Sequence, residues 1–452
     1  MPRSVHKGCD DFRQTGAATR ERWLGGGLTR RQALLGALGG GLAIYAERAL
    51  PWAHVLEAAS AQAAEAPGAR VLVSVFLPGG CDLLDTLPPI GAYGRYADLR
   101  GGMELEAPPA LGATGLGIHP SLAEGTNGGV KGLFEVGKIG FLPGIDYANP
   151  DLSHFHSRHF WETGLITERA APGWLGRWLD HHGAKDNPLQ GLTLGYNLSP
   201  VLATSSAPVA ALESPSDVAL DVWGIGGRQS SQMLAAWQRM AEAGAAARGV
   251  GPQAVHTAAR LAKAVGDRLA PYAEHDGTDP LAPPVPYPAD DDLGRRLSRV
   301  AALVSQPLGV RLAAVEANAD FDTHDGQPGT LADALRSVSQ SLAAFQADLE
   351  ARGVADRVLT LVWSEFGRRP EGNESSGTDH GAGGIAWVQG THAASGILTE
   401  YPSLTELDRD DNLKVTVDFR KVYASLIEGW LGTDANEVIP NANAYGRLAL
   451  VR

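Results

Sequence analysis

The chain has 452 residues, of which 44% are hydrophobic and 20% are charged, as is ordinary for a globular protein. This length predicts two domains, or one large α/β domain with an insertion. The formal net charge of −13 argues against a nucleic-acid partner, because phosphate binding needs a basic surface. It does not exclude an anionic substrate, since a metal ion can reverse the local field. No apolar run of ~18 residues follows the N-terminal region, so we expect no stable membrane span in the mature chain.

The N-terminal region combines a basic segment with a short apolar run. Residues 1–31 carry seven basic residues against three acidic ones, and a Gly-rich apolar run over Ala33–Ile44 follows the twin arginines. This order indicates a twin-arginine export signal, with small-residue cleavage sites at Ala61 or Ala63; a disordered basic tail is the alternative. We therefore expect residues 1–66 to be the signal peptide and cleavage region, recognised by the twin-arginine export machinery, and the protein to be periplasmic or secreted.

Polar residues follow the first two predicted strands. Val71–Leu77 is an aliphatic run typical of a strand buried on both faces, as in a parallel sheet, and Asp82 comes shortly after it. Ile139–Leu142 is the second predicted strand, and Pro143 and Gly144 predict a turn at its end. The polar residues that come after this turn are Asp151, Ser153, His154, His156 and His159.

The next predicted strands repeat this plan. Val310–Val315 precedes a second acidic and histidine-containing cluster, and an amphipathic helix is predicted over residues 331–349. Arg357–Trp363 is the fourth strand, and Gly384–Gly390 is a further short one. Between them lies SEFGRRPEGNESSGTDHGAGG (residues 364–384), whose glycines and charges predict a site loop.

The polar clusters therefore share the carboxyl side of four predicted strands, where ligand sites form in open α/β sheets. The region of about residues 165–305 has a different pattern, with Ala-rich segments that predict helices and a Pro-rich connection over residues 280–292. We expect an α/β fold, namely a three-layer α/β/α sandwich with a mostly parallel central sheet. Residues 67–452 would form this domain, with a mainly helical insertion over about 165–305.

Two residue pairs have the chemistry of metal ligands. Asp322 and His324 are two residues apart, so in extended chain both side chains point to the same side. Asp379 and His380 are adjacent and could reach two ions, or one ion and a substrate. Carboxylates and neutral imidazoles are ligands of zinc, manganese and related ions. Each pair alone is commonly a capped turn or a solvated loop, but their shared position at strand ends favours a metal site.

Other residues are candidates for catalysis. Ser153 is a candidate nucleophile, because a hydroxyl at a helix N-terminus and beside a metal can ionise; the alternative is an N-cap with no further role. Arg368 could hold an anionic oxygen by a bidentate contact, or form a surface ion pair. Glu365 could be a metal ligand or the partner of Arg368. His154 or His380 could transfer protons.

Five segments in this order, behind the leader, resemble the bacterial family known as domain of unknown function 1501. They are VFLPGGCDLLDTLPP, LSHFHSRHFWETG, GWLGRWL, FDTHDGQ and SEFGRRPEGNESSGTDHGAGG, and the resemblance covers about Val71 to Leu431. That family is similar to the alkaline phosphatase and sulfatase superfamily, which implies an α/β/α sandwich and metal-assisted hydrolysis or transfer of phosphate or sulfate esters. The metal ligands that the resemblance implies are Asp82, Asp322, His324, Asp379 and His380, with Ser153 at the position of the alkoxide nucleophile.

The sequence also departs from the family pattern in two places. Arg369 stands where the family often has Thr, and the next histidine after Asp-His-Gly is the distant His392, which leaves a second metal open. Our preferred interpretation is an exported metal-dependent hydrolase of small anionic phosphate or sulfate esters, with a metal-activated serine or water as nucleophile. The divalent metal would be zinc or manganese, with calcium also possible. The alternative is a non-catalytic metal- or ligand-binding or assembly protein; a phosphomutase fits poorly with export.

Overall fold

The computed structural model describes residues 43–45, 69–213, 239, 250–274 and 276–452. The expected signal peptide and cleavage region therefore lies outside the described residues, apart from the short strand β1 (Ala43–Tyr45). Within the described ranges, no helix combines the length and apolar character needed to cross a bilayer.

A ten-stranded sheet forms the centre of the fold, in the order β1–β5–β4–β6–β2–β7–β10–β3–β11, with β12 also paired to β3. Among the strands described, β1 and β10 run antiparallel to their neighbours and the other pairings are parallel. The mostly parallel sheet is as predicted. Its strands after β1 are β2 (Val71–Phe76), β3 (Ile139–Asp146), β4 (Gly191–Leu194), β5 (Val209–Leu212), β6 (Leu312–Glu316), β7 (Val358–Trp363), β10 (Gly384–Gln389), β11 (Gly396–Ile397) and β12 (Val417–Asp418).

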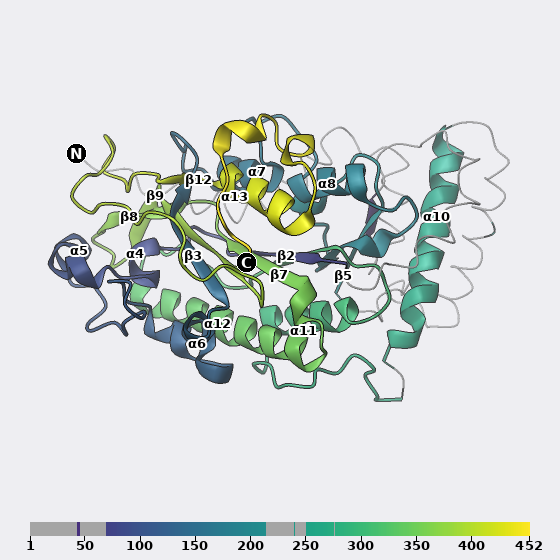
Figure 1. Cartoon of the computed structure of the whole chain (residues 1–452), viewed down its shortest axis with the longest axis horizontal. Coiled ribbons are helices and arrows are strands. Elements are labelled where there is room, and N and C mark those ends of the chain that lie inside the picture. Colours follow the sequence, from purple (N-terminus) through teal and green to yellow (C-terminus); the bar gives the residue numbers. More distant parts are fainter. Residues whose placement is uncertain (1–42, 46–68, 214–238, 240–249, 275) are drawn as a thin grey trace.

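Helices cover both faces of the sheet, which confirms the three-layer sandwich (Figure 1). All six residues of β2 are buried, because Val71, Val73 and Val75 face one helical layer while the alternate Leu72 faces the other. One layer holds α7 (His154–Thr163), α8 (Trp174–His182) and α13 (Phe419–Leu426), and the other holds α6 (Gly129–Glu135), α11 (Asp292–Val304) and α12 (Gln327–Ala351).

The described parts of the region of about residues 165–305 belong to the sandwich and do not form a helical insertion upon it. It supplies β4 and β5 to the central sheet, next to β6. These two strands have four residues each, so their pattern is too short to stand out in a region that also contains α8, α10 (Val250–Leu269) and α11. Residues 233–248, the first of the Ala-rich segments that predict helices, lie almost entirely outside the described part of the chain.

Strand β3 continues through Pro143 and Gly144, where the sequence predicts a turn. Pro143 lies opposite Ile385 of β10, and the register shifts between Gly384 and Ile385. Such a bulge accommodates a proline, which has no N–H to donate to the neighbouring strand. Gly144 adopts a φ of 71° and leaves no space for a side chain, because a Cβ would lie 2.2 Å from Thr416 Oγ1. The predicted turn is therefore a bulge within a longer strand.

The expected loop over residues 364–384 is largely a two-stranded antiparallel hairpin of β8 (Gly367–Gly372) and β9 (Thr378–Gly381). The glycines of this hairpin allow the backbones of β8, β9 and β10 to approach one another closely. A Cβ on Gly381 would lie 2.4 Å from Arg369 N, and one on Gly367 would lie 2.7 Å from Gly384 N. The sequence indicated a loop because glycines and charges hide the strand pattern.

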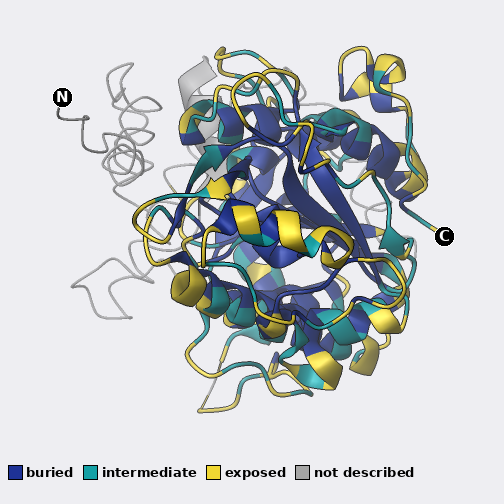
Figure 2. Cartoon of the chain, turned by 90° about the vertical axis from the view of Figure 1, so that its left-hand side faces the viewer, coloured by how far each residue is buried: buried dark blue, intermediate teal, exposed yellow. Residues whose placement is uncertain are grey.

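The carboxyl ends of β2, β6 and β7 lie at the same end of the molecule, because these three neighbouring strands run parallel. The hairpin, α4 (Leu83–Thr86) and α5 (Tyr93–Arg100) lie at this end, on the left of Figure 1. Figure 2 turns it toward the viewer: the sheet strands are buried, and the exposed residues lie on the helices and loops around them. The residues that follow the three strands are thus brought close together.

Candidate metal centre

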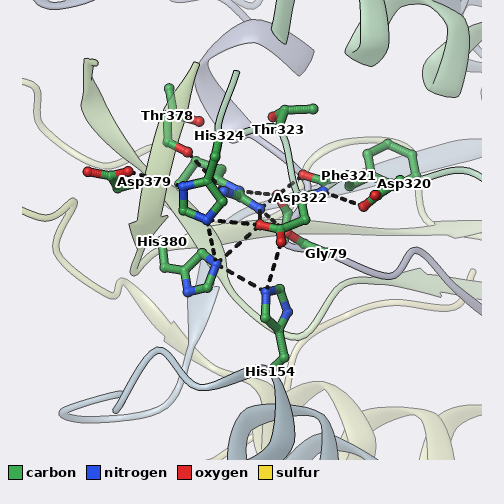
Figure 3. Close-up of polar contacts among 12 residues, drawn as sticks. Gly79, His154, Asp320, Phe321, Asp322, Thr323, His324, Thr378, Asp379 and His380 are labelled. Carbon is green, nitrogen blue, oxygen red and sulfur yellow. Dashed lines mark hydrogen bonds and ion pairs between the residues drawn. The ribbon is translucent and has the colours of Figure 1, made fainter. Parts of the chain in front are cut away.

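Three histidines from three separate elements point their Nε2 atoms toward one another (Figure 3). His154 is the first residue of α7, His324 follows β6, and His380 lies on β9. His380 Nε2 lies 3.0 Å from His154 Nε2 and 3.0 Å from His324 Nε2. The Asp322 carboxylate lies among them, with Oδ1 3.1 Å from His324 Nε2 and 3.2 Å from His380 Nε2. Ligand atoms of His154, Asp322 and His380 all lie within 4.8 Å of one another, so this group could hold a metal ion.

The other ring nitrogen of each histidine has an oxygen acceptor. A carbonyl or carboxylate oxygen only accepts, so Nδ1 carries the hydrogen and each neutral ring presents its Nε2 lone pair to the cluster. Lone pairs 3.0 Å apart need a proton or a cation between them. The Nδ1 partners are Glu365 Oε1 for His154 at 2.8 Å, Asp379 Oδ1 for His324 at 3.1 Å, and the Leu152 carbonyl for His380 at 2.9 Å.

This donor set fits a transition metal. Zinc binds imidazole nitrogen at about 2.0–2.1 Å, which puts tetrahedral ligand atoms roughly 3.3 Å apart, close to the 3.0 Å between His380 Nε2 and each of the other two Nε2 atoms. A carboxylate or carbonyl on Nδ1 is the usual outer partner of a metal-binding histidine. Asp379 was expected to be a ligand itself; the structure places it behind His324, as the group that orients that ring.

The carboxylates of the cluster stay ionised. Burial would raise the pKa of Asp322, but hydrogen bonds from His154, His324 and His380 hold it well below its usual range. Burial opposes a low pKa at Glu365 and Asp379 as well, and the histidine bonded to each lowers it. Burial would lower the pKa of His154, yet Asp322 and Glu365 raise it to about 9. The cluster therefore favours positive charge at its centre.

Arg368 stabilises the cluster through its hydrogen bond to Asp322, and it does not contact a substrate anion. Its side chain is fully buried, and Nη2 donates to Asp322 Oδ1 at 2.5 Å. The guanidinium also donates to four backbone carbonyls. The expectation that Arg368 holds a substrate oxygen is therefore wrong. Its N–H groups already donate to carbonyls in the loops that follow β2 and β6 and to a carbonyl on β9. The four carbonyls belong to Gly79, Gly80, Phe321 and Thr378.

Asp82, expected to be a ligand from the first strand, lies outside the histidine cluster. Its two oxygens are 2.6 and 2.7 Å from Arg100 Nη2, and Oδ1 also caps α4 by accepting from Leu84 N. Both partners of this ion pair are buried. No local pattern in the sequence indicates this pairing, because Arg100 lies 18 residues away on another helix.

Ser153, the expected nucleophile, is the N-cap of α7. Its Oγ accepts a long 3.5 Å hydrogen bond from His156 N. The preceding Leu152 has a φ of 57°, which costs about 1–2 kcal/mol for a residue with a side chain. This conformation accompanies the hydrogen bond from His380 to the Leu152 carbonyl, a contact that no feature of the sequence indicated.

Glu365 was expected to be a metal ligand or the partner of Arg368, and it is neither. Besides His154, its carboxylate accepts from Gly79 N at 2.9 Å and from Gly80 N at 3.3 Å. Gly79 has a φ of 115°, and a Cβ there would lie 2.3 Å from Asp322 N. The Pro-Gly-Gly sequence after β2 was therefore a signal of close backbone approach at the site.

The family model described as "Protein of unknown function (DUF1501)" matches residues 149–416, more than half of the chain. The chain belongs to the DUF1501 family. Solved structures similar to this DUF1501 protein include the crystal structure of PsFucS1 sulfatase from Pseudoalteromonas sp., which is 15% identical with a TM-score of 0.37, over 84% of this chain and 70% of that one. A likeness this distant says nothing about the activity of the present chain. A search of curated proteins finds no match.

Proposed function

We propose that this DUF1501 protein is an exported, metal-dependent hydrolase of phosphate or sulfate esters. The observation that carries the proposal is the convergence of three imidazole Nε2 atoms on the Asp322 carboxylate. Each ring is held by an acceptor on Nδ1, so the donors are arranged before any ion binds. Export is inferred from the twin-arginine pattern of the leader, and the protein would then act in the periplasm or outside the cell.

The chemistry of the donors favours zinc. Three imidazoles and one carboxylate suit zinc, and manganese less well, whereas calcium prefers a shell of oxygens. A divalent ion at this position would polarise an ester oxygen and lower the pKa of a water or hydroxyl beside it. His154 and His380, both expected to transfer protons, would belong to the ligand set and would not be free for that task. Glu365 and Asp379 would keep two of the rings in the required tautomer.

Charge balance indicates where an anionic substrate would be held. The carboxylates of Asp322, Glu365 and Asp379 together balance a divalent ion and the guanidinium of Arg368. Arg369, the next residue on β8, is half-buried, and its charge helps to lower the pKa of Asp379 beside His324. We therefore assign the contact with the substrate anion to Arg369 in place of Arg368.

One observation favours the alternative of a metal-binding protein without turnover. The side chains of His154, Asp322, His324 and His380 are 7, 5, 16 and 18% exposed, which leaves little surface open to a substrate. A closed site of four protein ligands is typical of structural zinc, whereas catalytic zinc keeps an open position.

Metal analysis and a turnover assay distinguish these functions. The purified protein should carry zinc, and it should hydrolyse p-nitrophenyl phosphate or p-nitrophenyl sulfate in a chelator-sensitive way. Asp322→Asn should abolish both properties, because the ligand charge is lost. Asp320→Asn is the matched control, since Asp320 is exposed and lies two residues away. Bound zinc without turnover of either ester would support the binding protein, and protein without metal would refute both.

A further inference from the structure

Gln327, the first residue of α12, is fully buried and forms hydrogen bonds to four side chains. Its Oε1 accepts from Thr323 Oγ1 at 2.8 Å and from Thr378 Oγ1 at 2.6 Å. Its Nε2 donates to Asp82 Oδ2 at 2.9 Å and to Asp85 Oδ2 at 2.6 Å. These contacts use both hydrogens and both lone pairs of the carboxamide.

The two threonines lie within the segments that carry the candidate ligands. Thr323 stands between Asp322 and His324, and Thr378 directly precedes Asp379 and His380. The segments also meet through the backbone, where Thr378 N donates to the Thr323 carbonyl at 3.0 Å. Gln327 Oε1 therefore bridges the two chain segments whose separation sets the spacing of the Nε2 atoms.

The opposite end of Gln327 is anchored in a buried ion-pair network. Arg100 lies 2.6 Å from Asp82 and 3.1 Å from Asp85, and these three side chains are at most 5% exposed. Arg100 Nη1 also donates to the carbonyls of Arg369 and Pro370 on β8. The network thus contacts both strands of the hairpin, β8 through Arg100 and β9 through Gln327. A buried network whose members are all satisfied is rigid.

We propose that Gln327 is a positioning residue that sets the separation of the two ligand-bearing segments and so determines the affinity of the site for zinc. The proposal rests on the metal site of the proposed function. An apolar residue at this position would remove the acceptor shared by the two threonine hydroxyls and one hydrogen-bond donor from each of Asp82 and Asp85. A glutamate would add a third acid beside Asp82 and Asp85. Loss of a direct partner of a ligating side chain typically weakens metal binding by about 10–100-fold, and Gln327 acts one contact further from the ion, so a smaller factor is expected.

The test compares Gln327→Met with Gln190→Met in the full chain. Gln190 is an equally buried carboxamide that accepts from Ala184 N and donates to the Pro208 carbonyl, next to β4 and β5. Zinc affinity is measured by competition with a chromophoric chelator, the coordination geometry by the visible absorption of bound Co²⁺, and stability by urea unfolding of the metal-free protein. We expect Gln327→Met to weaken zinc binding by up to about tenfold, less than the loss of a direct partner of a ligand would, and to alter the Co²⁺ spectrum. Gln190→Met should lose stability and bind both metals as the wild type does.

Thr378→Val provides a second variant, because it removes one hydroxyl contact to Gln327 and keeps the side-chain volume and the carbonyl that Arg368 uses. It should weaken zinc binding in the same direction by a smaller factor. Wild-type zinc affinity and Co²⁺ absorption in either variant would overturn the positioning role and leave the proposed function standing. A wild-type protein that binds neither metal would overturn the proposed function, and this inference with it.

Discussion

Replacing Glu365 with Gln should weaken zinc binding while the fold is retained. Glu365 is fully buried, and its Oε1 lies 2.8 Å from His154 Nδ1. Its carboxylate also accepts from the backbone N–H groups of Gly79 and Gly80. The amide of Gln has one oxygen and one nitrogen donor, so it cannot accept from all three groups.

The electrostatic effect of Glu365 is visible at the imidazole of His154. Asp322 and Glu365 together raise the pKa of this imidazole from 6.5 to about 9 against the effect of burial. That shift corresponds to about 3 kcal/mol in favour of positive charge on the ring. The same field also favours a proton on His154 at pH 7.5, so the expected change in zinc affinity is taken from the loss of the hydrogen bond behind this ligand and is about tenfold. The usual range for losing a carboxylate behind a ligating histidine is about 10–100-fold.

The assay is zinc titration of the metal-free protein by calorimetry or chelator competition at pH 7.5. Glu162→Gln is the matched control, because Glu162 is buried on α7, the helix that begins at His154, and is paired with Arg158 at 2.8 Å. We expect a dissociation constant about tenfold higher for Glu365→Gln and an unchanged one for Glu162→Gln. A zinc affinity for folded Glu365→Gln equal to that of the wild type would refute the role assigned to this carboxylate.

Three further results are expected. Ser153→Ala should cost about 1 kcal/mol in the free energy of unfolding and leave ester turnover nearly unchanged, because Ser153 caps α7; a kcat lower by about 100-fold or more would instead make it the nucleophile. Arg369→Gln should weaken inhibition by inorganic phosphate about tenfold, whereas Arg409→Gln, at an exposed ion pair, should not; equal inhibition of both variants would remove Arg369 from the anion site. Burial, and then the charge of Arg336, lower the pKa of His119 to about 4. The unfolded chain therefore takes up this proton first as pH falls below 6.5, and the native state should lose about 3 kcal/mol by pH 4. His119→Asn should flatten that part of a urea-unfolding profile, and an unchanged profile would contradict the assignment.

The central strands could be predicted because their residues are buried on both faces. Five of the six residues in each of Val71–Phe76 and Val358–Trp363 are apolar, so composition predicts the bounds of both strands to within one residue. The predicted position of the site at the carboxyl ends of these strands follows from parallel topology alone. The same reasoning missed β4 and β5, because strands of four residues carry too little pattern beside longer helices.

The roles of individual site residues depended on contacts that the sequence does not encode locally. Asp82 has the spacing expected of a ligand, yet a buried guanidinium from α5 uses both of its oxygens. Arg368 was expected to hold an anionic oxygen or to form a surface ion pair, but its guanidinium is buried and donates to four backbone carbonyls. Gln327 carries no charge, so nothing in the sequence distinguished it from a solvated helix residue.

The most direct test of this account is a crystal structure of zinc-loaded protein, with diffraction data collected on both sides of the zinc absorption edge. We predict one anomalous peak at about 2.0–2.1 Å from Nε2 of His154, His324 and His380, with Asp322 as the fourth protein ligand. The Nδ1 contacts to Glu365 and Asp379 should be unchanged in that structure. Zinc bound elsewhere, with the three imidazoles still in direct contact with one another, would contradict the metal centre on which the proposed function depends.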